Sequence, residues 1–179
     1  MALKILILDD AADIRHLISE ILQDEGYQCR EVGDSETALA SFKEDTPDLM
    51  ILDIWLQGSD KDGLELLIYF KKNNPEIPII MISGHADIET AVKAIKLGAY
   101  DFMEKPPDLN RLLLTVRNAL SQQTLAREVK QIKKKLPQLP PIIGESKPIQ
   151  RIKNIIDKVA PSQSRVLITG ENGTGKELV

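Results

Sequence analysis

Short apolar runs alternate with longer segments of helical spacing through the first 120 or so residues of the 179-residue chain. In the longer segments, apolar residues recur every three or four positions, which is the spacing of an amphipathic helix. Such alternation of strand and helix predicts an α/β fold in which a doubly wound, five-stranded parallel sheet is covered on both faces. The expected strands are residues 4–8, 27–32, 49–52, 79–82 and 100–104.

Capping and breaking residues set the limits of the predicted helices. The first helix carries the apolar residues from Ile14 to Leu22 and ends before Gly26. Asp34 is a typical N-cap for the second helix, which Pro47 closes. The remaining helices are expected at residues 63–73, at residues 88–97 with Gly98 as the C-terminal cap, and from about residue 108 to just before Pro137.

The last of these helices is longer than the sheet beneath it requires. Leu125, Val129, Ile132 and Leu136 follow one another at spacings of four, three and four, which is typical of a short coiled-coil seam. The alternative is a helix that frays into a linker. The proline-rich segment 137–141 cannot continue a helix and indicates a domain boundary. We therefore predict a first domain at 1–120, a helical linker at 121–139 and a second domain that begins at residue 140.

The second domain starts with a nucleotide-binding pattern. A helix from about Pro148 to Val159 and a strand at 165–169 precede the sequence Gly-Glu-Asn-Gly-Thr-Gly-Lys at 170–176. This is the G-x-x-x-x-G-K loop whose backbone cradles phosphates when it lies between a strand and a helix. The predicted phosphate-binding residues are Gly170, Gly173, Thr174, Gly175, Lys176 and Glu177. With only residues 140–179 present, the P-loop domain looks truncated, and we predict no ATP turnover by this chain.

Chemically active side chains stand where the strands of the first domain end. Asp9 and Asp10 follow the first strand, Asp53 the third, Ser83 ends the fourth and Lys105 follows the fifth. The carboxyl ends of parallel strands meet at one edge, where open α/β sheets bind ligands. Any one of these residues alone would be a helix cap or a solvated turn residue. Together they predict a site for Mg²⁺, which prefers carboxylate oxygens.

This arrangement resembles the receiver domain of two-component response regulators, including the Lys105–Pro106 step. Residues 140–179 resemble the start of the AAA+ module of bacterial enhancer-binding regulators. The segments 53–58 and 82–92 are similar to those of regulators from nitrogen-responsive two-component pairs. The resemblance implies a flavodoxin-like fold, a cytoplasmic protein, and transcription control through phosphorylation by a sensor histidine kinase.

The resemblance also assigns roles to individual residues. Asp53 would accept the phosphoryl group, and Lys105 and Ser83 would bind its oxygens. Asp9, Asp10, Asp53 and the backbone carbonyl of Trp55 would bind Mg²⁺, with Asp9 orienting metal-bound water. Phe102 would rotate into space that Ser83 vacates. It is a phenylalanine, so it lacks the hydroxyl that a version of the switch with a buried tyrosine would use.

The resemblance implies partners as well. A homodimer would form through the fourth helix, fifth strand and fifth helix, and the full-length protein would bind ATP. DNA and RNA polymerase with its sigma factor would be contacted only through parts beyond residue 179. The loop at 55–63 is about two residues longer than the usual receiver loop and lacks its proline. We therefore expect this loop to be more mobile and the Trp55 carbonyl to be less firmly placed.

Net charge, cysteine count and the length of the apolar runs argue against several other classes of protein. The net charge of −4 does not indicate a nucleic-acid-binding chain, and the single cysteine, Cys29, allows no internal disulfide. There is no signal peptide pattern and no apolar run long enough to cross a membrane. One rival is a P-loop ATPase whose N-terminal domain is only a scaffold. Another is an FMN-binding flavodoxin, although three acids at the edge would repel its phosphate.

Overall fold

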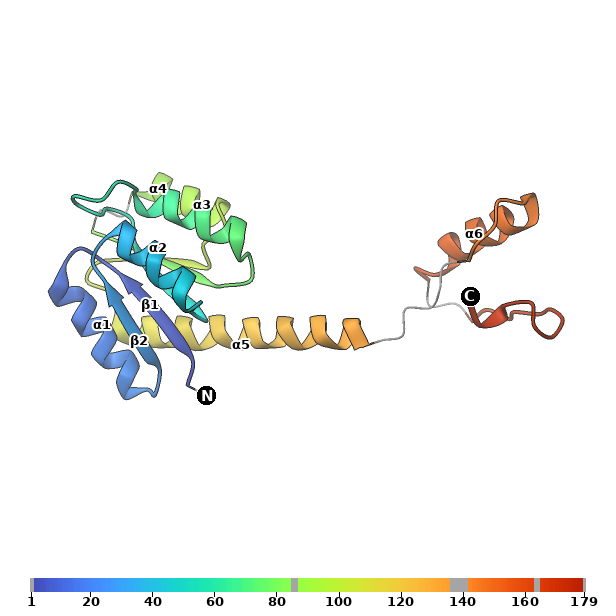
Figure 1. The fold of residues 1–179 in the computed structure, drawn as a ribbon, viewed down its shortest axis with the longest axis horizontal. Helices are drawn as coiled ribbons and strands as arrows, with labels where there is room; N and C mark the ends of the chain where they lie inside the picture. Colours follow the sequence, from blue (N-terminus) through green and yellow to red (C-terminus); the bar gives the residue numbers. More distant parts are fainter. Residues whose placement is uncertain (1, 85–86, 136–141, 163–164, 179) are drawn as a thin grey trace. The chain divides into compact units, whose positions relative to one another are not determined.

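The structure is a computed structural model that describes residues 2–84, 87–135, 142–162 and 165–178 (Figure 1). The chain forms two compact units, residues 1–130 and residues 131–179. In the described part of the chain, no helix is both long and apolar enough to span a membrane.

The first unit contains a five-stranded sheet in which every strand pair is parallel. The strand order is β2-β1-β3-β4-β5, with β1 in the interior and β2 and β5 at the edges. This confirms the predicted doubly wound sheet. The strands are β1 (Lys4–Leu8), β2 (Gln28–Val32), β3 (Leu49–Asp53), β4 (Ile79–Ser83) and β5 (Asp101–Glu104).

Four helices connect the successive strands, and a fifth follows β5. All five begin and end close to the predicted residues. The Asp34 side chain accepts a hydrogen bond from the backbone N–H of Thr37, which confirms its predicted capping role. Gly98 follows the fourth helix with φ of 101°, a backbone conformation that favours glycine. The helices are α1 (Ala12–Asp24), α2 (Ser35–Glu44), α3 (Gly63–Asn73), α4 (Ile88–Lys96) and α5 (Leu109–Lys135).

Helices cover both faces of the sheet (Figure 1), and an apolar layer of buried side chains packs on each face. Successive side chains of a strand point to opposite faces, so the strands contribute to both layers. In β1, Leu6 and Leu8 pack with residues of α2, α3 and α4, whereas Ile5 and Ile7 pack with residues of α1 and α5. Continuous apolar strands buried on both faces leave the strand ends as the place for polar side chains.

Helix α5 continues past the residues that pack on the sheet. Leu112, Val116 and Leu120 are buried in the second apolar layer. Further along the helix, Arg127 Nη1 lies 3.1 Å from Asp48 Oδ1, and Lys130 forms an ion pair with Glu76 at 3.2 Å. These pairs tie the continuation of α5 to the segments that precede β3 and β4.

The second unit contains α6 (Lys147–Val159), close to the predicted helix, and a short 3₁₀ turn η1 (Lys176–Leu178). The strand predicted at residues 165–169 is wrong, because these residues form no strand in the structure. A parallel strand satisfies its backbone groups through neighbouring strands, and the described part of this unit offers no strand to pair with. The boundary predicted at 137–141 lies outside the described residues.

Candidate functional site

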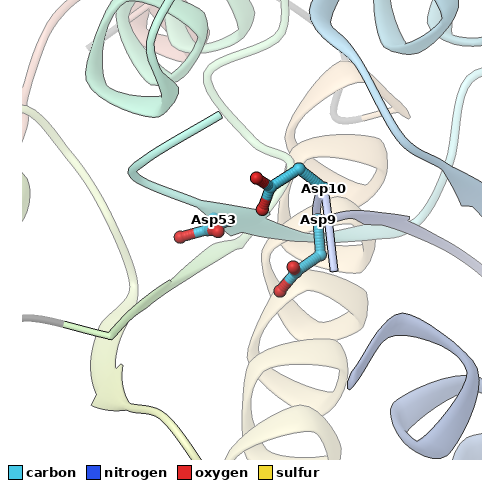
Figure 2. Close-up of side chains that lie close together, drawn as sticks. All are labelled: Asp9, Asp10 and Asp53. Atoms are coloured by element: carbon cyan, nitrogen blue, oxygen red, sulfur yellow. The ribbon is translucent and has the colours of Figure 1, made fainter. Parts of the chain in front are cut away.

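Three carboxylates meet at the carboxyl ends of two neighbouring strands. Strands β1 and β3 are adjacent and in register, with Leu8 opposite Leu52. The residues that follow, Asp9 with Asp10 and Asp53, therefore come to the same edge of the sheet (Figure 2). One oxygen from each of the three carboxylates lies within 4.8 Å of the others. Asp9 and Asp53 are only 2% and 3% exposed.

A single ammonium group lies between two of these acids. Lys105 follows β5, and its backbone N–H donates a hydrogen bond to the carbonyl of Ser83 at 2.8 Å. Its Nζ atom lies 2.6 Å from Oδ2 of Asp9 and 2.6 Å from Oδ2 of Asp53. With its side chain 11% exposed, Lys105 shares one buried positive charge between two buried carboxylates.

Burial and charge shift the protonation equilibria of this cluster. Burial raises the pKa of Asp53, and the nearby Asp9 charge raises it further, while hydrogen bonding to Lys105 opposes both effects. For Lys105, burial lowers the pKa, but the hydrogen bonds to Asp53 and Asp9 outweigh it, so the pKa of its ammonium lies above the usual value. The lysine therefore stays charged, and the cluster gains from any further positive charge.

Backbone N–H groups hold each of the three carboxylates differently. Asp9 Oδ1 accepts a hydrogen bond from Ala11 at 2.9 Å, and Asp53 Oδ1 accepts one from Trp55 at 3.2 Å. The partly exposed Asp10 accepts a longer one, 3.3 Å, from the N–H of Gln57. Because Lys105 also binds Asp9 and Asp53, the carboxylate of Asp10 is the least constrained of the three.

The other predicted site residues lie on β4, β5 and the loop after β3. Ser83 is fully buried at the end of β4, opposite Glu104 of β5. Phe102 is partly buried against the apolar layer that α2, α3 and α4 cover. Trp55 is 56% exposed, two residues after Asp53. The predicted phosphate-binding sequence at 170–176 belongs to the second compact unit.

In the second unit, the side chain of Lys176 binds to backbone carbonyls of its own loop, residues 170–176. Lys176 Nζ donates hydrogen bonds to the backbone carbonyls of Gly170, at 2.9 Å, and Glu171. Thr174 Oγ1 donates a hydrogen bond to the Glu171 carbonyl at 2.8 Å. The lysine ammonium and the threonine hydroxyl, two side-chain donors of the predicted phosphate-binding sequence, are thus both bound to backbone carbonyls of the same loop.

Three contacts at the acidic edge were not predicted from the sequence. Gln57 contacts Asp10 through its backbone, which no residue type would reveal. Gly63 approaches the backbone of Asp53 so closely that no side chain fits between them. Arg15 donates to the backbone carbonyl of Asp9. Its position six residues after Asp9, one turn into a helix, is the one signal that could have identified it.

The strand order and the buried aspartate that shares a lysine with a second acid define a receiver-type signalling domain. Residues 5–117 match the family model of the response regulator receiver domain, and residues 142–179 match that of the sigma-54 interaction domain. The chain therefore belongs to the response regulator family, with a receiver domain followed by a fragment of a sigma-54-type ATPase domain. This assignment decides against the FMN-binding alternative.

Relatives share both parts. The chain is 51% identical over 178 residues to the nitrogen assimilation regulatory protein NtrX of Azorhizobium caulinodans, covering 99% of this chain and 39% of the relative. A crystal structure of NtrX from Brucella abortus matches with a TM-score of 0.79 and 48% identity, covering 99% of this chain and 39% of that one. An ATP complex of the same Brucella protein matches with a TM-score of 0.75 and 48% identity, over 99% and 39% of the two chains. The chain thus spans about two fifths of the length of these relatives.

Proposed function

We propose that this chain is a phosphorylation switch in which Asp53 accepts a phosphoryl group from a phosphohistidine on a sensor histidine kinase. The observation that supports the proposal most directly is the shared ammonium of Lys105, 2.6 Å from both Asp53 and Asp9. A carboxylate that is buried, grouped with two other acids and paired with one lysine is suited to bind a cation and a phosphoryl group together.

The acidic cluster fits Mg²⁺. The ion prefers hard oxygen ligands and usually binds one or two carboxylates together with phosphate and water. Asp10 and Asp53 would supply carboxylates, the Trp55 carbonyl would supply a backbone oxygen, and Asp9 would orient metal-bound water. When bound, Mg²⁺ offsets the negative charge that the phosphoryl oxygens and the carboxylates bring together.

Asp53, Lys105 and Ser83 would each have a separate role in phosphoryl transfer. A carboxylate oxygen of Asp53 attacks phosphorus, a P–O bond forms, and the P–N bond to the donor imidazole breaks. Lys105 turns from the carboxylate to a phosphoryl oxygen, and Ser83 donates a hydrogen bond to another. Each such charge-assisted bond contributes about 1.5–3 kcal/mol, enough for two or three of them to favour a second conformation.

We propose that phosphorylation changes the conformation of Phe102 and of the surface around it. As Ser83 moves toward the phosphoryl group, Phe102 would rotate inward from its partly buried position on β5. This would reshape the face formed by α4, β5 and α5, through which we propose that the chain forms a homodimer. Ile88, Val92 and Ile95 of α4 leave 82%, 45% and 48% of their surface exposed, which is apolar area that a second copy could cover.

The full-length protein would use further partners. The relatives' names support a role in nitrogen regulation, and the ATP complex of the Brucella relative supports ATP binding at Gly170, Gly173, Thr174, Gly175, Lys176 and Glu177. DNA and sigma-factor contacts would come from residues beyond 179. With only a fragment of the ATPase domain, this chain would act as a phosphoryl acceptor and would not turn over ATP.

Intact-mass spectrometry tests the proposal. Wild type, Asp53→Asn and the control Asp101→Asn, which changes an acid on β5 outside the cluster, are incubated with acetyl phosphate and Mg²⁺. We expect one phosphoryl group on wild type and on the control, and none on Asp53→Asn. Equal phosphate uptake by all three chains would contradict the assignment of Asp53.

A further inference from the structure

Arg15 ties together three segments at the acidic edge. It lies in the first turns of α1, and its Nη1 atom donates a hydrogen bond to the backbone carbonyl of Asp9 at 2.5 Å. Its Nε atom lies 3.6 Å from Oε2 of Glu31 on β2. Only 18% of the side chain is exposed. The arginine thus connects the end of β1, the start of α1 and the end of β2.

The backbone beside Arg15 leaves room for it. A Cβ atom at Gly33, directly after β2, would lie 3.3 Å from Arg15 Nη1. That is tighter than an ordinary van der Waals contact, so a Cβ atom here would force the guanidinium to shift by a few tenths of an ångström. The neighbouring Asp9 N–H donates to the carbonyl of Val32 at 3.3 Å. Glycine at position 33 therefore allows the guanidinium to reach the Asp9 carbonyl.

Holding this carbonyl fixes where Asp10 stands. A peptide unit is planar, so the Asp9 carbonyl and the N–H of Asp10 turn as one rigid body. On the other side of Asp10, the N–H of Ala11 is bound to the Asp9 carboxylate at 2.9 Å. The Asp10 side chain itself is held by a hydrogen bond of only 3.3 Å. Its position therefore depends on the backbone turn that Arg15 and Asp9 secure.

We propose that Arg15 is a positioning residue for Mg²⁺ binding, acting through the Asp9 carbonyl to place the Asp10 carboxylate. The inference rests on the proposed function, which assigns Mg²⁺ to this cluster. Arg15 would not bind the ion, since a guanidinium has no lone pair to donate. Residues that orient metal ligands from behind commonly change metal affinity by about 10–100-fold when they are mutated.

A purely electrostatic role for Arg15 predicts the opposite sign. Its positive charge lies close to the cation site, so removing it would strengthen Mg²⁺ binding if charge alone mattered. Glu31, 3.6 Å from Arg15 Nε, offsets part of that charge. If Arg15 works by holding the backbone, its removal weakens Mg²⁺ binding despite the gain in negative potential.

Isothermal titration calorimetry with Mg²⁺ on the whole chain tests the inference. We expect Arg15→Ala to weaken Mg²⁺ binding about tenfold relative to wild type. Arg30→Ala is the control, because Arg30 lies on β2 and, like Arg15, pairs with an acid, Glu44 at 2.8 Å, but away from the cluster. We expect Arg30→Ala to bind Mg²⁺ like wild type. Unchanged or tighter binding by Arg15→Ala would overturn the inference.

A second variant covers the case in which Arg15→Ala unfolds. Gly33→Ala keeps the arginine and its charge but crowds Nη1, and we expect it to weaken Mg²⁺ binding in the same direction. Melting temperatures without Mg²⁺ separate a general loss of stability from a loss of affinity. Wild-type affinity in folded Gly33→Ala would contradict the positioning role, whereas a wild-type chain that binds no Mg²⁺ would contradict the proposed function itself.

Discussion

Gly63 begins α3 directly against the backbone of Asp53: a Cβ atom at position 63 would lie 2.0 Å from the Asp53 carbonyl oxygen. The Gly63 N–H also donates to the Ile54 carbonyl at 2.9 Å. The loop that leaves the proposed phosphorylation site therefore returns within contact distance of it. Any side chain at position 63 would have to push the acid's backbone aside.

We predict that Gly63→Ala lowers the free energy of unfolding by at least about 2 kcal/mol, since overpacking against backbone cannot relax by a rotamer change. Phosphate uptake at Asp53 should fall with it. Urea denaturation measures the first effect and intact mass the second. Gly84→Ala is the control for stability, because an added Cβ there would meet no heavy atom within 4 Å. Equal stability of the two variants would contradict this close approach.

The raised pKa of Asp53 predicts that the acid costs stability when it is ionised. Burial raises this pKa above the value in the unfolded chain, so the folded state binds the proton more tightly. The stability associated with Asp53 is therefore greatest at low pH and is lost as pH rises through the folded-state pKa. We expect Asp53→Asn to be more stable than wild type at neutral pH by about 1 kcal/mol, or about 3 °C.

This difference should shrink as pH falls, and thermal melts between pH 4 and pH 8, in roughly one-unit steps across the usual carboxyl range, would measure it. Asp34 offers a comparison of opposite sign, because hydrogen bonding from Thr37 holds its pKa below the usual value. Its contribution is lost as pH falls, and Asp34→Asn should lose less stability in acid than wild type does. A constant gap between Asp53→Asn and wild type at all pH values would contradict the assigned direction.

Lys105→Met should have the opposite effect to Asp53→Asn at neutral pH. It leaves the carboxylates of Asp9 and Asp53 buried without their shared ammonium, and breaking a buried pair in this way costs about 3–5 kcal/mol. The raised pKa of Lys105 means that its contribution persists through neutral pH and is lost only as pH rises through that value. Thermal melts with and without Mg²⁺ measure the loss, and we expect the cation to restore part of it.

Lys4→Met is the matched control for Lys105→Met. Lys4 pairs with Asp45 at 2.7 Å, but the two side chains are 45% and 40% exposed, so water screens the pair. We expect this substitution to cost less than about 1 kcal/mol and Mg²⁺ to have the same effect as on wild type. Similar losses of stability in the two variants would show that the Lys105 ammonium contributes no more to the free energy of unfolding than an exposed lysine does.

The fold of the first unit could be predicted because each local signal agrees with the next. Apolar runs such as residues 79–82 are too short for helices and are buried on both faces of the sheet. Helix ends are marked by residues such as Asp34, whose side chain caps α2, and Gly98, whose positive φ ends α4. The acidic edge followed from topology, since strand ends meet in a parallel sheet. The strand at 165–169 failed because its formation depends on partner strands, which the apolar pattern of a single segment does not supply.

The contacts that could not be predicted are those made by backbone atoms. The N–H of Gln57 and the carbonyl of Asp9 exist at every position, so no sequence pattern marks them as partners of Asp10 and Arg15. Gly63 and Gly33 are informative only once the chain is folded, because what matters is the atom that an added Cβ would meet. Residue types thus indicated which side chains meet, and the folded backbone determines how firmly they are held.

The continuation of α5 gives the last prediction, which concerns assembly. Leu125, Val129 and Ile132 are 62%, 51% and 60% exposed and follow the coiled-coil spacing, while Leu136 lies outside the described residues. If a second copy covers these side chains, Val129→Glu should weaken dimerisation at least about tenfold, because each dimer would lose the burial of two half-exposed valines, together worth roughly 1.5–3 kcal/mol. Sedimentation equilibrium measures this, with Gln131→Glu adding the same charge at an exposed polar position as the control. If the helix is only a linker, the two variants and wild type will sediment alike.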